Sequence, residues 1–393
     1  MGGPRSNPQL KEQIRRRSRE LGFVQCGFTT PDPPPHFALF QAWLESGRHG
    51  RMAYLQSARA RSARGQPQRL LASCRSIIVL AAAYPAPSAP GPDPMAGRLA
   101  CYAQGDDYHD VLLPKLKALV GFIEEKLGRT IEFRAYTDTG PILERDLAQR
   151  AGLGWIGKNT LLIHPRYGSC FFLAEILIDV LLAPDEPFEP DRCGTCTRCL
   201  QACPTQCILP NRTLDARRCL SYLTIELKGP VPAELREPVG NWVFGCDVCQ
   251  EVCPWNRRAQ SPPPDAHFLP RGHFPIADLT RELALDKTQA AERFRGSPLR
   301  RTKREGYRRN VALALGNTRQ PAAVPALSQA LRDPLPLIRQ HAAWALGRIG
   351  SAHAKEALAQ ALPEEQDLGC QQEILSALGG KAADPAERGQ AKP

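Results

Sequence analysis

The chain contains the segment Cys193-Gly194-Thr195-Cys196-Thr197-Arg198-Cys199-Leu200-Gln201-Ala202-Cys203-Pro204, in which the cysteines follow the spacing C-x2-C-x2-C-x3-C-P. A second segment follows C-x2-C-x3-C-P from Cys246 through Cys249 to Cys253-Pro254, and Cys219 lies between the two segments. Eight of the 14 cysteines therefore belong to one pattern. This pattern is typical of proteins that hold two iron–sulfur clusters.

The eight cysteines form two complete ligand sets if the last cysteine of each motif binds the other cluster, as in bacterial two-cluster ferredoxins. The first [4Fe–4S] cluster then takes Cys193, Cys196, Cys199 and Cys253. The second takes Cys203, Cys246 and Cys249, with Cys219 in place of the missing first cysteine of the second motif. Zinc is the alternative, because paired C-x2-C motifs also build zinc sites. Zinc requires neither the third cysteine of the run nor the prolines, so the pattern favours iron–sulfur clusters and electron transfer.

The composition is that of a globular protein with two or three domains. The 393 residues are 42% hydrophobic and 23% charged. The first residues show no export signal, and no apolar run reaches the roughly 20 residues that a membrane helix needs. Together with the cluster cysteines, this predicts a protein of the reducing cytoplasm without a membrane segment. The net charge of +11 fits either simple solubility or a polyanionic partner, most often nucleic acid.

Residues 1–185 alternate between helical and strand patterns. Apolar periodicity predicts helices over 10–21, 110–127 and 141–151, and buried strands over 76–84, 131–136 and 170–180. We therefore expect an α/β domain with a buried sheet. The ferredoxin-like module is expected over 186–260, and a proline-rich linker or wrap over 261–299.

A short repeat marks the C-terminal part of the chain. Ala314-Leu315-Gly316 recurs as Ala345-Leu346-Gly347 and as Ala377-Leu378-Gly379, at spacings of 31 and 32 residues. This period predicts an α-solenoid of HEAT-like helix pairs over 300–380, with a disordered tail over 381–393. Unrelated alanine-rich helices are the alternative.

A glycine-rich stretch, Gly152–Gly157, matches G-x-G-x-x-G, but a helix precedes it and an apparent loop follows. A dinucleotide fingerprint needs a strand before it and a helix after it, so we reject NAD binding. The following Lys158, Asn159 and Thr160 could still help to cradle phosphates or amides.

The segment from Asp107 to Leu112 approaches D-x-H-x-x-G, the signature of cobalamin proteins that use a histidine as lower ligand. Leu112 stands where that signature requires glycine. We therefore expect that His109 is not a cobalt ligand.

Two single residues have both a structural and a functional interpretation. Asp138 follows the predicted strand 131–136, where it could stabilise the N-terminus of the next helix or serve as a ligand-binding carboxyl at a strand end. Cys101 could be a small core thiol. Taken alone, both patterns favour the structural interpretation.

A basic run leads into the predicted solenoid. It includes Arg300, Arg301, Lys303, Arg304, Arg308 and Arg309, with only Glu305 in opposition. Such a run is often a solvated helix face, but in a basic protein it favours a surface that contacts phosphates.

Four segments together resemble the epoxyqueuosine reductase family over nearly the whole chain. They are Tyr136-Thr137-Asp138-Thr139-Gly140-Pro141-Ile142-Leu143-Glu144-Arg145, Gly152 to Leu161, Cys219 to Gly229, and Gly245 to Asn256. Tyr307-Arg308-Arg309-Asn310, followed by Ala314-Leu315-Gly316-Asn317, is similar to the start of that family's C-terminal HEAT-like domain.

The resemblance implies an enzyme that reduces epoxyqueuosine to queuosine at the wobble position of tRNA, with base-off cobalamin and two [4Fe–4S] clusters. By resemblance, Asp138 is the proton donor, Cys101 lies near the corrin, and Arg64 matches a corrin-side arginine. Cys207 stands where many relatives carry a small residue. The tRNA contacts are expected at Lys228, Arg301, Lys303, Arg304, Arg308 and Arg309.

Two other functions remain as alternatives. A reductive dehalogenase is similar in combining a corrinoid with two clusters, but it usually carries an export signal. A non-catalytic electron-transfer protein would leave the α/β domain without a role. We expect a monomer that receives electrons from an unidentified low-potential donor.

Overall fold

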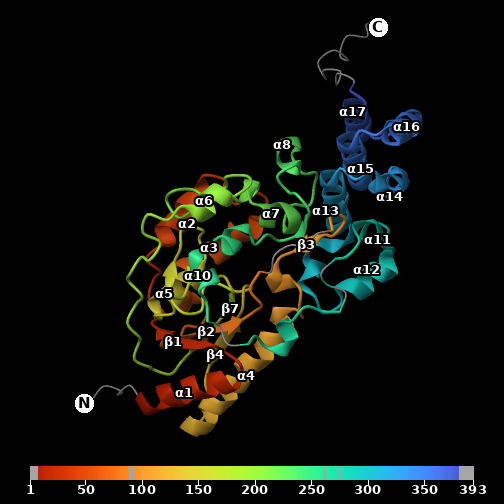
Figure 1. Ribbon diagram of the computed structural model, residues 1–393. Coiled ribbons are helices and arrows are strands. Elements are labelled where there is room, and N and C mark those ends of the chain that lie inside the picture. The colour runs from red at the N-terminus through yellow and green to blue at the C-terminus, as the bar shows by residue number, and fades with distance from the viewer. Residues whose placement is uncertain (1–7, 88–92, 261–262, 273, 275, 380–393) are drawn as a thin grey trace.

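A computed structural model describes residues 8–87, 93–260, 263–272, 274 and 276–379 of the chain. In Figure 1 the α/β domain lies at the bottom, near the N-terminus, and the last helices rise toward the C-terminus at the top. The predicted tail over 381–393 lies outside the described residues, as do parts of the segment 261–299.

A four-stranded sheet organises the first domain. Its strands lie in the order β1 (Gln25–Thr29), β2 (Ser76–Ala83), β7 (Phe171–Ile178) and β4 (Phe133–Tyr136). Every neighbouring pair is antiparallel. The three predicted strands are confirmed, but the rule that places ligands at the carboxyl ends of parallel strands does not apply to this sheet.

Helices cover both faces of the sheet, which explains the continuous apolar runs of β2 and β7. Helices α1 (Pro8–Glu20) and α4 (Tyr108–Leu127) share one buried core with one face, and lie side by side in Figure 1. Helix α5 (Glu144–Arg150) contributes Leu147 and Ala148 to the core on the other face. It begins at Glu144 instead of Pro141, because the first helical bonds are accepted by the Leu143 carbonyl.

Short elements complete this domain and join it to the cysteine-rich module. The domain adds α2 (Phe37–Glu45), α3 (Ala58–Gly65) and the hairpin β5 (Trp155–Ile156) and β6 (Leu162–Ile163). The module contains α6 (Arg198–Ala202), α7 (Leu220–Ile225), α8 (Ala233–Arg236), α9 (Val248–Glu251) and α10 (Pro254–Arg257). Strand β3 (Arg98–Leu99) pairs in parallel with β8 (Trp242–Phe244) and so connects the two domains.

The C-terminal part is a stack of helices, as the repeat predicts. It contains α13 (Lys303–Thr318), α14 (Val324–Ala330), α15 (Pro336–Ile349), α16 (Ala352–Ala361) and α17 (Leu368–Ala377). A Cβ atom on Gly316 would lie 2.7 Å from the Ala345 Cα, and one on Gly347 would lie 2.9 Å from the Ala377 Cα. The glycine of each repeat copy therefore permits close packing against the alanine of the next.

The segment expected to be a linker also contains helices. These are α11 (Leu279–Leu283) and α12 (Lys287–Phe294), and they share the buried core of α13. The segment also bonds to the first domain, where the Gly97 N–H donates to the Ile276 carbonyl at 3.0 Å. Residues 279–294 are thus part of the helical domain.

The basic run at the start of the helical domain is partly buried. Arg309 is 0% exposed, and its guanidinium donates to the carbonyls of Leu223 at 2.6 Å and of Leu227 and Gly229 at 2.7 Å. Arg308 is also buried and pairs with Asp333. The prediction that Arg308 and Arg309 contact phosphates was wrong, because protein acceptors already hold both side chains.

We predict that Arg309→Ala lowers the free energy of unfolding by at least about 3 kcal/mol, since it leaves buried carbonyls without donors. Urea unfolding followed by circular dichroism measures this change. The control is Arg332→Ala at an exposed position of the same domain, for which we expect a change within about 0.5 kcal/mol. Equal stability of the two variants would contradict the structural role of Arg309.

Candidate active site and cluster sites

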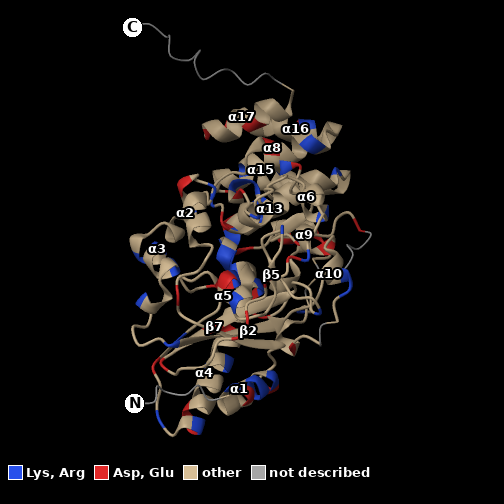
Figure 2. Ribbon diagram, turned by 90° about the vertical axis from the view of Figure 1, so that its left-hand side faces the viewer, with Lys and Arg blue, Asp and Glu red and all other residues tan. Residues whose placement is uncertain are grey.

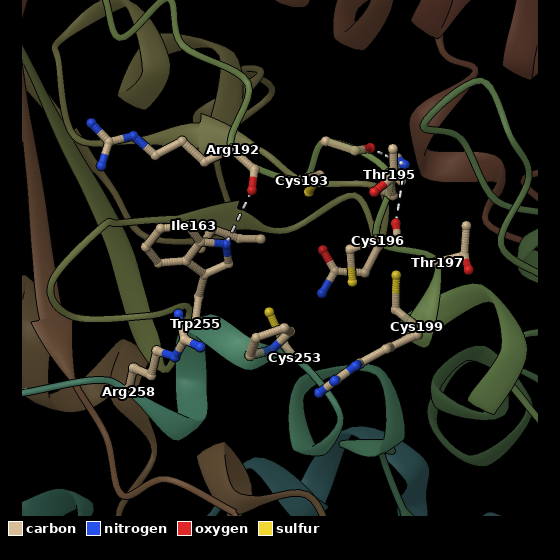
Figure 3. A pocket seen from close by; sticks show the side chains of 15 residues that line it. Ile163, Arg192, Cys193, Thr195, Cys196, Thr197, Cys199, Cys253, Trp255 and Arg258 are labelled. Carbon is tan, nitrogen blue, oxygen red and sulfur yellow. Dashed lines mark hydrogen bonds between the residues drawn. The ribbon is translucent and has the colours of Figure 1, made fainter.

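The first cysteine set lines one open cavity of about 680 Å³. Cys193, Cys196 and Cys199 come from the loop before α6 and its first turn, and Cys253 caps the N-terminus of α10. Figure 3 shows their sulfur atoms directed toward a common space. The Trp155 indole N–H donates to the Cys193 sulfur at 3.5 Å, as is common for cluster ligands.

The second set lies at the ends of short helices. Cys203 follows α6, Cys219 precedes α7, and Cys246 and Cys249 lie at the start of α9. Burial raises the pKa of the Cys246 and Cys249 thiols, and the neighbouring Cys219 raises it further.

Both sets supply thiolates, which are the usual ligands of iron–sulfur clusters. Within the described part of the chain, no group of three or more histidine, cysteine, aspartate or glutamate residues is arranged to hold a single metal ion. The ligands of a cluster each bind a different iron atom, so they stand farther apart than the ligands of one zinc ion. The two predicted sets are therefore compatible with the cluster assignment.

Cys207 lies beside the second set. Its sulfur is 3.5 Å from that of Cys203, and it also contacts Cys219. The spacing pattern gave no role to this thiol, and the fold buries it next to two expected ligands.

Asp138 lies in a tight turn after β4, with a backbone φ of 59°. Its backbone N–H donates to Glu144 Oε1 at 2.6 Å, and the Tyr108 hydroxyl donates to its Oδ2 at 2.8 Å. Arg301 Nη1 lies 3.6 Å from the same oxygen. A left-handed conformation is uncommon for residues other than glycine, and such strain concentrates at functional sites.

An aromatic cavity of about 160 Å³ adjoins Asp138. Tyr84, Tyr102, Tyr108, Phe171 and Phe172 line it together with Asp138 and Glu144. The Tyr108 and Phe172 rings are stacked with centroids 4.4 Å apart. The cavity thus combines a flat apolar wall with carboxyl groups.

His109 and Cys101 lie next to this cavity. His109 Nδ1 is 2.7 Å from Asp107 Oδ1, and its Nε2 is 3.9 Å from Asp138 Oδ2. The buried Cys101 donates its backbone N–H to Asp247 Oδ2 at 2.7 Å. Because Asp247 directly follows Cys246, this bond connects the cavity region to the second cysteine set.

Of the other residues predicted to contact a cofactor, Arg64 lies near Asp138, whereas Lys158 and Asn159 lie at the first cysteine set. Arg64 is buried, and Glu144 and Asp138 are among the charges that act on its guanidinium. Lys158 instead donates to the carbonyls of Gly194 at 2.6 Å and Cys196 at 3.0 Å, in the loop of the first cysteine set. Asn159 lines the same cavity as Lys158.

Thr160 is held by Arg145, whose guanidinium donates to the Thr160 carbonyl at 2.8 Å. The three residues 158–160, which the sequence suggested as a possible cradle for phosphates or amides, are therefore divided between two places. Lys158 and Asn159 belong to the first cluster cavity.

Sequence reasoning missed the roles of Tyr108, Glu144 and Arg301 at this site. Arg301 was expected only as a phosphate contact, yet its Nε also lies 2.8 Å from Glu226 Oε1 of the cysteine-rich module. For Glu144, a usable signal was its place six residues after Asp138 in one of the quoted segments.

Comparison with known families matches three parts of the chain. The 4Fe-4S double cluster binding domain matches residues 192–256, Epoxyqueuosine reductase QueG, DUF1730 matches residues 64–139, and HEAT repeats match residues 298–379. These matches and the fold define an iron–sulfur oxidoreductase with a HEAT-repeat domain.

Curated relatives and solved structures agree. The chain is 42% identical to the epoxyqueuosine reductase of Pseudomonas aeruginosa over 88% of this chain and 96% of the relative. It is 38% identical to that of Escherichia coli over 88% and 92%. A structure of epoxyqueuosine reductase from Bacillus subtilis matches with a TM-score of 0.85 and 33% identity, over 94% of this chain and 98% of that one. The chain belongs to the epoxyqueuosine reductase family.

We predict that Cys219→Ser retains the first cluster and loses the second, so that iron falls from about eight to about four atoms per chain after reconstitution. Iron and sulfide analysis with EPR of the reduced protein measures this loss. Cys370→Ser is the control, because Cys370 lies in the helical domain and donates to the Pro336 carbonyl, a bond that serine can keep. Full iron content in Cys219→Ser would remove Cys219 from the ligand set.

Proposed function

We propose that this chain reduces epoxyqueuosine in a tRNA anticodon loop to queuosine, with Asp138 as the proton donor and cobalamin as the cofactor at the aromatic cavity. The main supporting observation is Asp138 beside that cavity, whose backbone has a left-handed φ and donates to Glu144, and whose carboxyl accepts a hydrogen bond from Tyr108. A related structure holds an epoxyqueuosine-modified tRNA-Tyr stem loop, with a TM-score of 0.87 and 34% identity over 94% of this chain and 98% of that one. The Bacillus subtilis structure has its catalytic aspartate loop swung out of the active site.

The residues at the cavity fit a corrin. Tyr102, Tyr108 and Phe172 offer flat aromatic surfaces, and Cys101 and Arg64 flank the region. His109 Nδ1 lies 2.7 Å from Asp107 Oδ1 and its Nε2 lies 3.9 Å from Asp138 Oδ2, so this imidazole lies beside the proposed proton donor. When bound, cobalamin supplies the low-potential metal chemistry that epoxide reduction requires.

The hydrogen bonds at Asp138 identify the oxygen that can act. Tyr108 occupies Oδ2, so Oδ1 is the oxygen available to carry a proton to the substrate. Arg301 Nη1, at 3.6 Å from Oδ2, stabilises the carboxylate after the proton has left. Reduction of the epoxide to an alkene consumes two electrons and two protons and releases water.

We predict that Asp138→Asn binds both clusters and cobalamin but loses at least about 100-fold in turnover, because an amide cannot serve as the acid. The measurement is nucleoside analysis of epoxyqueuosine-containing tRNA after anaerobic incubation with reductant. Asp110→Asn on α4, which changes a largely exposed carboxyl in the same way, is the control. Normal turnover by Asp138→Asn would exclude this residue as the donor. Absence of queuosine from the wild-type reaction would favour a dehalogenase-like or purely electron-transferring protein.

The arrangement of the cluster sites supports a direction for electron flow. The first set lines an open cavity, whereas the second adjoins Cys101 through Asp247. Electrons therefore enter at the first cluster and pass through the second toward the aromatic cavity. Lys158, Arg192, Arg198 and Arg258 line the open cavity, so the unidentified low-potential donor is expected to present an acidic surface.

Fewer basic residues are exposed for contact with tRNA than the sequence suggested. Lys228, Arg301 and Lys303 are exposed, whereas Arg304 is half-buried and donates to the Leu285 carbonyl. Lys228 and Arg301 are joined, because Lys228 Nζ donates to the Arg301 carbonyl at 2.9 Å. Figure 2 shows basic and acidic residues interspersed over the ribbon.

We predict that Lys303→Glu weakens binding of an epoxyqueuosine-containing stem loop several-fold at low salt and lowers the salt dependence of binding by about one phosphate contact. Fluorescence anisotropy over a range of salt concentrations measures both effects. Lys126→Glu, at the distant end of α4, introduces the same charge change as a control. Equal losses in the two variants would indicate a non-specific effect of net charge.

A further inference from the structure

Glu175 is a carboxyl group buried in the core of the first domain. It lies in β7, in the apolar sequence Phe-Phe-Leu-Ala-Glu-Ile-Leu-Ile, and it is 0% exposed. Its register partners are Val79 on β2 and Tyr136 on β4. Its side chain therefore points into the layer between the sheet and α5, where the surrounding core is apolar.

Glu175 also lacks the donors that buried carboxyls normally have. Within the described residues, neither of its carboxyl oxygens has a hydrogen-bond donor from a backbone or basic group. The polar group next to it is the carboxyl of Glu144, the first residue of α5. Two carboxyl groups can face each other in an apolar layer only if they share a proton.

Glu144 connects Glu175 to the active site. Its Oε1 accepts the Asp138 backbone N–H at 2.6 Å, and its side chain lines the aromatic cavity together with Asp138. The three carboxyls thus form a line from the core, through the N-terminus of α5, to the cavity.

The groups around Glu144 and Glu175 leave the pKa of both carboxyls raised. Burial and, to a smaller extent, the charge of Asp138 raise the pKa of Glu144 to about 8, while Arg145 acts in the opposite direction. Burial raises the pKa of Glu175 well above its usual range, with Glu144 and Asp138 adding to the effect. Arg64 and Tyr108 are the other titratable groups that interact with Glu144. At neutral pH the pair keeps at least one proton.

We propose that Glu144 and Glu175 form a shared-proton carboxyl pair that reloads Asp138 during the reaction. This inference rests on the proposed function of Asp138. The epoxide needs two protons and two electrons to give an alkene and water. Asp138 Oδ1 delivers the first proton to the epoxide oxygen, and Glu144 returns a proton to Asp138 for the second. The proton that Glu144 passes on is the one it shares with Glu175, and solvent returns a proton to the pair as this one leaves, so that the two carboxyls are not left ionised together. Electrons come only from the clusters.

The shared proton has a signature that needs neither substrate nor cobalamin. The folded protein keeps this proton up to about pH 8, whereas the unfolded chain releases it near the usual glutamate value of 4.5. Folding therefore binds a proton between these pH values, and stability falls as the pH rises through them. We expect the melting temperature of the cluster-loaded wild-type protein to fall between about pH 5.5 and pH 8.5. In Glu175→Gln the melting temperature should fall less steeply over the same pH range. Glu125→Gln, at an exposed position of α4, should keep the wild-type slope.

Turnover distinguishes proton supply from a structural role. Glu144→Gln keeps an acceptor for the Asp138 N–H but cannot donate as a carboxylic acid, and Glu175→Gln keeps the volume of the side chain. Under single-turnover conditions we expect both variants to form queuosine at least about tenfold more slowly, with unchanged tRNA affinity. The wild-type rate should fall above about pH 8, and this decline should be absent in Glu175→Gln.

Two results would overturn the proposal, and a third would separate it from the proposed function. Wild-type rates and pH profile in Glu175→Gln would overturn it and leave the pair as a structural feature. If Glu175→Gln does not fold, infrared spectra of the wild type must show a protonated carboxyl at pH 7 that is lost in Glu144→Gln, and its absence would overturn the proposal. Failure of the proposed function can be distinguished from failure of the carboxyl pair. In the first case Asp138→Asn would be active, while the pH dependence of the stability of the wild-type protein would remain.

Discussion

One buried guanidinium determines how the parts of this protein fit together. Arg309 comes from the first long helix of the repeat domain and donates to three backbone carbonyls that follow α7 or lie within it. Beside it, the Asn310 amide donates to the carbonyls of Thr224 and Val243, both at 2.8 Å. A buried charge is costly unless its donors are satisfied, so the helical domain has one strongly preferred position against the cysteine-rich module.

That position brings residues from three domains to one carboxyl. Tyr108 and Glu144 come from the α/β domain, Glu226 follows α7, and Arg301 lies just before α13. Arg301 bridges Glu226 and Asp138, which are in different domains. The surroundings of the Asp138 carboxyl therefore depend on an interface with the other two domains, which the sequence of the α/β domain does not describe. The same interface places exposed basic residues beside the cavity, where an anionic substrate would have to approach.

Much of this could be predicted because some patterns are local. The cysteine spacing indicates two clusters, since ligands within one loop must keep a fixed separation. The Ala-Leu-Gly repeat indicates stacked helices, and the glycine marks the contact between them. Arg309 was misassigned because a basic residue looks the same in sequence whether its donors meet phosphates or carbonyls. The antiparallel sheet and the burial of Glu175 depend on strand order, which no single segment encodes. The one charge in an otherwise apolar strand was the available signal for Glu175.

The bonds of Arg309 also have a consequence for biosynthesis. Cys219, an expected ligand of the second cluster, directly precedes α7. The carbonyls in and after that helix receive hydrogen bonds from Arg309, which lies some 80 residues later in the chain. During synthesis on the ribosome, these carbonyls near the second cysteine set gain their donor only after α13 has emerged and docked. The first cysteine set does not share this dependence, because the residues that line its cavity all precede the repeat domain.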